Sequence, residues 1–539
     1  MSKRISFVFL LVLLIQYALF AQTEVNIIPR PEIVEIKPGM FKITDRGCVF
    51  NSHSGFADAA RFLQGQLLQK RGWTYYSCPT ASSALVRFHF NKDVDPEAYM
   101  LEIIDKQIVI TASSSAGAQY AVSSLLQLIF NGEKTGETIR IPAVSIKDKP
   151  LYVWRGFMLD ESRHFFGKKK VKDLLDWMAF YKLNKFHWHL TDEPAWRIEI
   201  KRYPYLTLVG GVGTYTNPFA EAQYYTQSDI TEIVRYAAER QIEVIPEIDM
   251  PGHATAANRA YPQYSGGGST NHPDFTFHPG KKGTYSYLSN ILREVNALFP
   301  AQIIHLGGDE VAFGSEAWNK DVLIDSLKLR HGLKTNKDVE TYFMRRMADS
   351  LFAMQAKLIV WDEMAEADLP KDKTIQYWWR HDKPAQLKLC LDNGYPTVLC
   401  PRIPLYFDFV QAADHKHGRK WSKTFNPLED LYHYDFFEFN KLQKFEGQIL
   451  GIQANLWTET VDNNNRLDFL IFPRIAALAE QAWTKPERKD YAVFTQHLKQ
   501  HLQLYKEGGL YYFDPFNNTH AEPLLNKPIL KKYIDNPED

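Results

Sequence analysis

The sequence lacks several features that would indicate a particular class of protein. Acidic and basic residues balance, at 63 each among 539 residues, and no long run of like charge occurs. A neutral chain offers no net field that would attract nucleic acid or an anionic membrane. No glycine-rich GxGxxG follows a candidate strand, and no basic cluster suits a phosphate, which argues against dinucleotide and phosphate ligands. We therefore expect no nucleic-acid partner and no cofactor.

Cysteine is scarce as well. The chain has four, Cys48, Cys78, Cys390 and Cys400, and they are scattered without a CxxC pair. Their spacing does not indicate a metal cluster, so no metal site is predicted from them. An exported protein could oxidise them in pairs, but the sequence leaves the pairing open.

Long apolar runs are confined to the N-terminus. Residues 1–21 carry Lys3 and Arg4, followed by an almost unbroken apolar stretch from Ile5 to Ile15 and a small-residue end. This is the pattern of a secretory signal peptide, and its apolar core is short for a membrane span. We expect cleavage near the end of this segment and export to a periplasm or the cell exterior, with no membrane insertion after signal removal.

The length and pattern of the rest of the chain predict more than one domain. Residues 22–150 mix short β-rich runs with a helical stretch from Gly117 to about Phe130, which predicts a small α+β domain. From residue 151 to residue 507, strands alternate with amphipathic helices, as in parallel βα units. We expect residues 508–539 to form a C-terminal tail.

Eight candidate strands fall within residues 151–507. They are Val153–Leu159, Lys185–Leu190, Glu243–Ile248, Gln302–Leu306, Lys357–Val360, Thr374–Tyr377, Pro396–Leu399 and Gln448–Gln453. Eight strands with intervening helices predict an α/β fold of the (β/α)8 TIM-barrel type. In that fold the chemistry gathers at the carboxyl ends of the strands.

Charged groups and aromatic rings alternate at those strand ends. In chain order they are Asp160 and Arg163; His187, His189 and Asp192; Glu247, Asp249 and His253; Asp309 and Glu310; Trp361, Asp362 and Glu363; Trp378 and Trp379; Tyr406 and Asp408; Trp457 and Glu459. A purely structural barrel end has no need for so many costly polar groups beside large rings. A pocket that binds hydroxyls and stacks on ring faces does, so a sugar ligand is indicated.

The adjacent acids Asp309 and Glu310 are the most informative part of this set. They close a short apolar strand and follow Gly307 and Gly308. Neighbouring side chains of a regular strand point to opposite faces, so both acids can serve one ligand only if the chain bends there, as the glycines permit. Two adjacent acids repel each other, which suits a substrate that develops positive charge.

Four ordered motifs resemble those of the β-N-acetylhexosaminidases of glycoside hydrolase family 20. They are RGFMLDESRHF at residues 155–165, HWHLTD at 187–192, EIDMPGH at 247–253 and HLGGDE at 305–310. The resemblance covers nearly the whole mature chain up to about residue 508. It implies removal of terminal, non-reducing β-linked N-acetylglucosamine or N-acetylgalactosamine from glycans, with retention of configuration.

The resemblance also implies a substrate-assisted mechanism, in which the 2-acetamido oxygen of the sugar attacks its own anomeric carbon. Glu310 resembles the general acid and base, with a pKa raised by burial and by Asp309. Asp309 resembles the acceptor of the acetamido N–H, and Tyr406 the donor to its carbonyl oxygen. Asp192 and His253 resemble residues that orient Glu310.

The remaining residues carried over by the resemblance bind the sugar itself. Trp361, Trp378 and Trp457 would wall the acetamido methyl group and the ring, where Trp378 is preferred to Trp379 from the context Gln376-Tyr377-Trp378. The outer hydroxyls would be held by charged side chains suited to vicinal diols, namely Arg163, Asp408 and Glu459.

Two other functions stay open from the residues alone. His187 and His189 form an HxH at a strand end, which with His253, His305 and Asp309 would suit a metal-dependent amidohydrolase. That hypothesis leaves the arginine, the tyrosine and the tryptophans without a role. The other alternative is a secreted sugar-binding protein that has lost turnover, against which the intact acid pair argues.

Overall fold

The computed structural model describes residues 24–104, 106–420, 424–436, 445, 447–517 and 521–526. The predicted signal peptide lies outside these residues. The chain forms two compact units, the first made of the residues up to Pro150 together with Thr484–His501, and the second of Leu151–Trp483 and the residues from Leu502 onward. The sequence pattern changes at the same first boundary, but it gave no sign that residues 484–501 return to the first unit.

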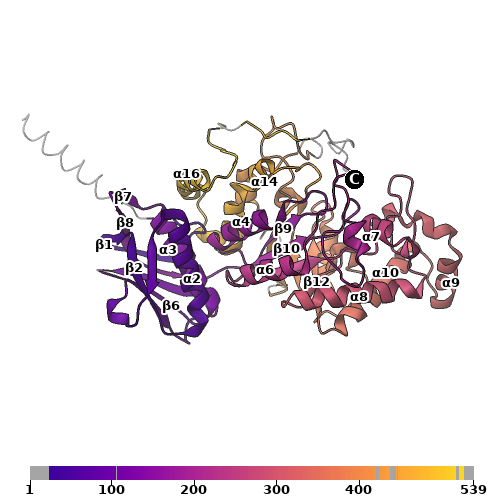
Figure 1. The fold of residues 1–539 in the computed structure, drawn as a ribbon, viewed down its shortest axis with the longest axis horizontal. Coiled ribbons are helices and arrows are strands. Elements are labelled where there is room, and N and C mark those ends of the chain that lie inside the picture. Colours follow the sequence, from indigo (N-terminus) through magenta and orange to yellow (C-terminus); the bar gives the residue numbers. More distant parts are fainter. Residues whose placement is uncertain are drawn as a thin grey trace, which may run out of the picture. The chain divides into compact units, whose positions relative to one another are not determined.

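The first unit contains a mixed sheet of eight strands in the order β1-β8-β5-β6-β4-β2-β3, with β7 beside β8. Helices α2 (Ala57–Arg71) and α3 (Ser115–Phe130) pack against each other on one face of this sheet (Figure 1). The strands are β1 (Ile33–Thr44), β2 (Arg46–Asn51), β3 (Thr74–Ser77), β4 (Val86–Phe90), β5 (Tyr99–Ile104), β6 (Gln107–Ala112), β7 (Glu133–Thr135) and β8 (Thr138–Asp148).

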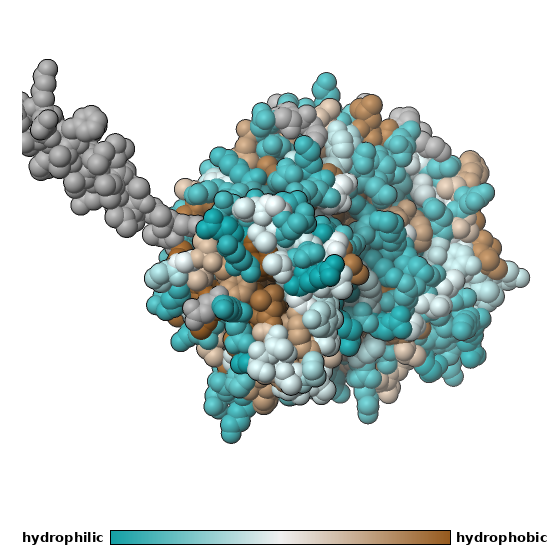
Figure 2. Space-filling view, turned by 60° about the vertical axis from the view of Figure 1, so that its left-hand side comes forward, coloured by the Kyte–Doolittle hydropathy of each residue, from teal (hydrophilic) through white to brown (hydrophobic). Residues whose placement is uncertain are grey.

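The sequence left the cysteine pairing open, and the structure shows one disulfide in this unit. A disulfide joins Cys48 to Cys78, whereas Cys390 and Cys400 in the second unit are free and buried. Hydrophilic residues cover much of the face shown in Figure 2, with hydrophobic residues in small groups among them. No described helix is long and apolar enough to cross a membrane.

The second unit is a closed barrel of eight parallel strands, as the alternating pattern predicted. The strand order around the barrel is β9 to β16, with β16 paired to β9. The strands are β9 (Trp154–Asp160), β10 (Lys185–His189), β11 (Glu243–Glu247), β12 (Ile303–His305), β13 (Lys357–Trp361), β14 (Thr374–Trp378), β15 (Thr397–Leu399) and β16 (Ile449–Leu456).

Helices surround the barrel, and α4, α6, α8 and α10 follow one another side by side along it (Figure 1). The helices are α4 (Gly167–Phe180), α5 (Tyr205–Leu208), α6 (Gln227–Ala238), α7 (Thr255–Ala260), α8 (Lys282–Leu298), α9 (Val322–His331), α10 (Asn336–Phe352), α11 (Pro384–Asp392), α12 (Arg402–Leu405), α13 (Leu428–His433), α14 (Asn464–Ile471), α15 (Arg474–Trp483) and α16 (Tyr491–Glu507). The connection from β13 to β14 is fully described and holds only the 3-10 turn Asp362–Met364.

Alternate residues of each strand point into the barrel, because side chains alternate between the two faces of a strand. One buried cluster inside the barrel contains Ile359 and Trp361 of β13 and Ile375 and Tyr377 of β14. The same alternation continues one residue past the end of β14, so Trp379 belongs to this inward-facing cluster as well. The strand register thus decides which residues reach the mouth of the barrel.

Candidate active site

The acid pair lies where the chain turns sharply after β12. Gly307 and Gly308 have φ values of +67° and +88°, and Glu310 has φ +52°, so the backbone leaves the strand through left-handed conformations. A Cβ atom at Gly307 would lie 1.8 Å from Oδ1 of Asp249. This position therefore requires glycine for both conformation and space, and the bend lets both acids face one site.

Both carboxylates face His253. Its Nε2 lies 3.4 Å from Oε2 of Glu310 and 3.7 Å from Oδ2 of Asp309. The side chains of Asp309 and Glu310 remain 12 % and 26 % exposed, so a ligand can reach both of them. Oδ1 of Asp309 is buried and has no hydrogen-bond partner among the described residues, which leaves an acceptor open.

The pKa values of Asp309 and Glu310 are shifted in opposite directions. Burial raises the pKa of Asp309 well above its usual range, against the opposing charge of His253 and with the help of the Glu310 charge. Burial also acts on Glu310, but the hydrogen bond to His253 and the His253 charge outweigh it and lower the pKa of Glu310. The expectation of a raised pKa for Glu310 is therefore wrong, because the imidazole lies closer to Glu310 than to Asp309.

Asp192 contacts the other side of His253, as expected if both residues orient Glu310. Nδ1 of His253 lies 3.1 Å from Oδ1 of Asp192, and Nη1 of Arg163 lies 2.7 Å from Oδ2 of Asp192. Burial alone would lower the pKa of His253, but Asp192 raises it well above its usual range. The imidazole is thus held as a cation between two carboxylates.

Four aromatic side chains line the mouth of the barrel beside the acids. Trp361, Trp379, Tyr406 and Trp457 belong to one buried cluster. The rings of Trp379 and Tyr406 are nearly parallel, with centroids 6.2 Å apart, and Trp457 lies 6.2 Å from both Tyr406 and Trp361. Flat apolar faces with a phenol among them suit the ring and the amide arm of a sugar.

Trp378 does not belong to this wall. It is completely buried, and its indole Nε1 donates toward the carbonyl oxygen of Lys383, 3.4 Å away. The preference for Trp378 over Trp379 is therefore corrected, because β14 turns Ile375, Tyr377 and Trp379 inward. The indole of Trp379 donates to Oε2 of Glu363 at 3.1 Å, which fixes its ring at the rim.

This assignment predicts different effects for two adjacent substitutions. Trp379→Phe should raise KM for a small glycoside by up to about tenfold, since an aromatic contact contributes about 0.5–1.5 kcal/mol. Trp378→Phe is the matched control and should lower thermal stability while leaving KM near the wild-type value. Steady-state kinetics and thermal unfolding of both variants check this, and a larger KM effect at Trp378 would refute the assignment.

Charged side chains lie next to this aromatic cluster. Arg163 lies over the ring of Trp457 at 5.0 Å, and its Nη2 lies 3.9 Å from Oε1 of Glu459. Burial raises the pKa of Asp408 to about 7, against the opposing charge of Arg419. Neither carboxylate oxygen of Asp408 accepts a hydrogen bond from a described residue, although Nε of Arg419 lies 3.3 Å from Oδ2. These buried oxygens can accept ligand hydroxyls.

Arg419 is a site residue that the sequence did not reveal. Its guanidinium pairs with two acids of the site, since Nη2 lies 3.3 Å from Oε1 of Glu459 while Nε lies 3.3 Å from Oδ2 of Asp408. It comes from the loop after Asp408 rather than from a strand end, and it is aligned by a backbone bond of 3.2 Å from its own N–H to the Asp408 carbonyl oxygen. No strand periodicity marks such a position.

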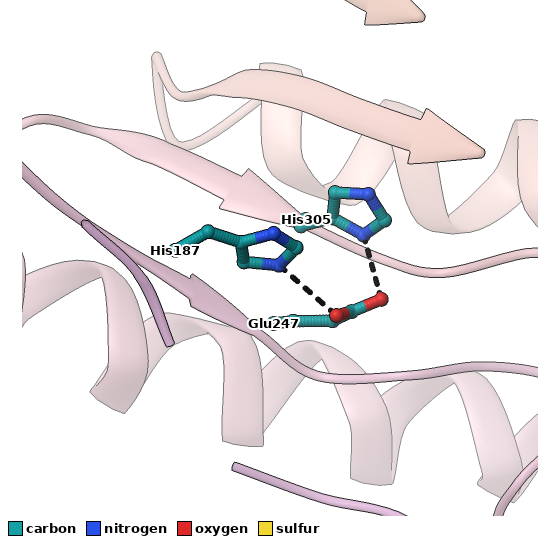
Figure 3. A group of neighbouring side chains, drawn as sticks. All are labelled: His187, Glu247 and His305. Carbon is teal, nitrogen blue, oxygen red and sulfur yellow. Dashed lines mark ion pairs between the residues drawn. The ribbon is translucent and has the colours of Figure 1, made fainter. Parts of the chain in front are cut away.

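The histidines of the HxH lie deeper, in the barrel centre. His187 and His305 face the carboxylate of Glu247 (Figure 3), with nitrogen–oxygen distances of 3.0 and 2.9 Å. His189 faces Glu247 on one side and Asp192 on the other. The nitrogens of these histidines thus face carboxylates in a fully buried core, and the indole of Trp361 donates to the same Glu247 carboxylate.

Comparison with known proteins agrees with this geometry. Residues 152–486 match the model of glycosyl hydrolase family 20, catalytic domain, and residues 24–149 match glycosyl hydrolase family 20, domain 2. A β-hexosaminidase of Vibrio furnissii is 34% identical over 473 residues, covering 84% of this chain and 76% of the relative. A β-N-acetylhexosaminidase of Cellulomonas fimi is 28% identical, covering 94% and 98%.

A solved structure shows the same arrangement of the chain. The GH20 exo-β-N-acetylglucosaminidase of Vibrio harveyi, in complex with N-acetylglucosamine, superposes with a TM-score of 0.85 at 32% identity and covers 91% of this chain and 79% of that chain. The β-N-acetylhexosaminidase of Bacteroides fragilis superposes with a TM-score of 0.79 at 30% identity, covering 91% and 97%.

Proposed function

Because the chain belongs to glycosyl hydrolase family 20, we propose that it is an exo-acting β-N-acetylhexosaminidase. It hydrolyses terminal, non-reducing β-linked N-acetylglucosamine or N-acetylgalactosamine with retention of configuration. The observation that carries the proposal is that the acid pair Asp309 and Glu310, both facing His253, lies at the same end of the barrel as the aromatic cluster that contains Tyr406. The names of the relatives from Vibrio furnissii and Cellulomonas fimi support the same activity.

The substrate supplies its own nucleophile. Asp309, whose buried Oδ1 is an open acceptor, takes the acetamido N–H, and the Tyr406 hydroxyl donates to the acetamido carbonyl oxygen. The amide arm is then held in line with the anomeric carbon. The carbonyl oxygen forms a bond to that carbon, the glycosidic bond breaks, and an oxazolinium ion results. Such positioning is worth about 7–11 kcal/mol relative to a bimolecular attack.

Glu310 moves the proton in both steps. In the free enzyme burial raises the pKa of Asp309 and so favours its protonated form, whereas His253 lowers the pKa of Glu310 and so favours its anion. When the acetamido N–H reaches Asp309, that carboxyl gains a donor and is stabilised as the anion, so the proton passes to Glu310. Glu310 then protonates the leaving oxygen and afterwards accepts a proton from the water that opens the oxazolinium ion.

The remaining residues hold the sugar. Arg163, Asp408 and Glu459 receive the outer hydroxyls, and Arg419 keeps the two acids in place. The rings of Trp361, Trp379 and Trp457 enclose the acetamido methyl group and one face of the pyranose. These contacts recognise one terminal sugar unit, which is what an exo-acting enzyme requires.

A thiazoline analogue of the cyclised intermediate tests the proposal. The enzyme should hydrolyse chromogenic β-N-acetylglucosaminides in the presence of EDTA, and the thiazoline should inhibit it competitively at concentrations about a hundredfold or more below KM, as transition-state mimics do. Loss of activity on prolonged chelation would instead support the metal-dependent alternative. Sugar bonded covalently to a side chain of the enzyme would also overturn the mechanism.

We further propose that the protein is exported. The predicted signal at residues 1–21 and the disulfide between Cys48 and Cys78 support this, because disulfides persist in oxidising compartments. The mature protein then meets N-acetylhexosamine-terminated glycans in the periplasm or outside the cell. N-terminal sequencing of protein recovered outside the cytoplasm checks it, and an intact Met1 would contradict it.

A further inference from the structure

Glu247 is the charged group at the centre of the barrel, and the proposed mechanism does not use it. Its side chain is completely buried, yet four nitrogen atoms face its two oxygens. Nε2 of His187 and Nδ1 of His189 lie 3.0 and 2.5 Å from Oε2, and Nδ1 of His305 and Nε1 of Trp361 lie 2.9 and 3.0 Å from Oε1. Figure 3 shows His187 and His305 converging on this carboxylate.

The ring of His187 is anchored by its other nitrogen. Nε2 of Gln453 lies 3.1 Å from Nδ1 of His187 and donates to it, so the proton of His187 is on Nε2 and faces Glu247. Burial lowers the pKa of His187 to about 4, against the opposing charge of Glu247, which keeps this ring neutral. His187 thus stabilises Glu247 as a neutral donor.

His189 differs, because both of its nitrogens face carboxylates. Nδ1 lies 2.5 Å from Glu247, and Nε2 lies 2.9 Å from Oδ2 of Asp192. A ring with an acid at each nitrogen donates at both and carries a positive charge. His189 therefore connects Glu247 to Asp192, which in turn contacts His253.

We propose that Glu247 and His189 are positioning residues that extend the charge chain behind the catalytic acid to the barrel centre. The full chain is Glu247, His189, Asp192, His253 and Glu310, in which acids and imidazoles alternate. In each contact of the chain the nitrogen and oxygen atoms lie 3.4 Å apart or less. The inference rests on the proposed role of Glu310 and goes beyond it, because it assigns a function to two residues that touch no substrate.

The chain has two consequences for the reaction. The same carboxylate that holds His189 also receives the indole of Trp361, so one buried anion fixes both the acid and a wall of the sugar pocket. In addition, the charge on His189 contributes to the potential at His253 and Glu310, where protons are exchanged. Changing this charge should therefore change the pH range of activity.

Several other charges face these groups and remain in every variant considered. Near His189, Nη1 of Arg163 lies 3.4 Å from Nε2. The groups that act on His253 and Glu310 are Asp192, Asp249, Asp309, Arg163 and Arg419. Because none of them is altered, a shift of the pH profile reports the charge at His189 or Glu247.

The first test is His189→Gln, assayed as kcat/KM against pH on a chromogenic N-acetylglucosaminide. The variant loses a buried positive charge, while His187 and Trp361 still face the carboxylate of Glu247. Protonated forms of His253 and Glu310 become more stable, so both limbs of the profile should move to higher pH by about half a unit. An active variant with unmoved limbs overturns the proposal.

Glu247→Gln is the second variant, and it should shift the pH profile in the opposite direction. It removes a negative charge behind His189, so both limbs should move to lower pH. General loss of packing does not produce shifts of opposite sign in the two variants. His305→Gln is the matched control, since His305 faces Oε1 of Glu247 and does not contact Asp192; it should lower stability and leave the limbs in place.

A readout without turnover separates this inference from the proposed function. The titration of His253, followed by NMR of labelled histidine in the wild type and in each variant, should shift in the same directions as the limbs. If the wild type does not hydrolyse N-acetylhexosaminides, the proposed function fails. The NMR shifts still test whether the charges of His189 and Glu247 act on His253. Titration of His253 that is identical in all variants overturns the chain.

Discussion

A β-glucoside should be hydrolysed about five orders of magnitude more slowly than the matching β-N-acetylglucosaminide. The glucoside has a hydroxyl at carbon 2 and lacks the amide oxygen that attacks the anomeric carbon. It therefore loses the positioned internal nucleophile, which contributes about 7 kcal/mol or more. Measurement of kcat/KM for the two nitrophenyl glycosides under identical conditions checks this expectation.

The N-acetylgalactosaminide is the control for that comparison. It keeps the acetamido arm and differs at carbon 4, so it should be turned over at a rate much closer to that of the N-acetylglucosaminide. Turnover of the glucoside at a rate comparable to either amide would show that the enzyme supplies its own nucleophile. The assisted mechanism would then be abandoned.

Replacement of Asp309 by Asn should lower kcat by about two to three orders of magnitude. The variant keeps the shape of the side chain but loses the charge that opposes the positive oxazolinium ion, and removal of one preorganised electrostatic partner has effects of this size. Because the interaction strengthens as positive charge develops, the loss should fall on kcat rather than on KM. Steady-state kinetics with an N-acetylglucosaminide measures both.

Asp362→Asn is the matched control for Asp309→Asn. Asp362 likewise follows a barrel strand, but it is fully buried and its carboxylate pairs with Arg380 at 3.1 Å. Its replacement should reduce stability, since the half-buried Arg380 then keeps only its longer contact of 3.7 Å with Glu363, while kcat stays close to the wild-type value. A decrease of less than tenfold for Asp309→Asn would reduce Asp309 to a structural role.

The sequence was sufficient to predict the barrel and most of the residues at its strand ends. Parallel strands buried on both faces give short apolar runs, and helices between them give a different period, so their alternation is visible without a structure. The acid pair, Tyr406, Asp408 and Glu459 all lie in the segments that follow the carboxyl ends of β12, β15 and β16, which places them at the mouth. Their common location follows from the topology alone.

The features that sequence could not supply depend on single-residue register and on contacts between distant segments. Trp378 and Trp379 are adjacent tryptophans, and only the pleat of β14 decides which of them faces the pocket. The lowered pKa of Glu310 depends on His253, which comes from another strand end. Arg419 reaches the site from a loop with no period to mark it.

The return of Thr484–His501 to the first unit makes that unit discontinuous in sequence. Within it, Thr484 donates to the carbonyl oxygen of Arg30 and Lys485 pairs with Glu32, so the N-terminal segment is completed by residues from beyond the barrel. During synthesis the ribosome releases the whole barrel before these residues emerge. The N-terminal unit therefore begins before the barrel and is completed only after all eight barrel strands have been made, and a fragment ending at Pro150 would lack part of its own fold.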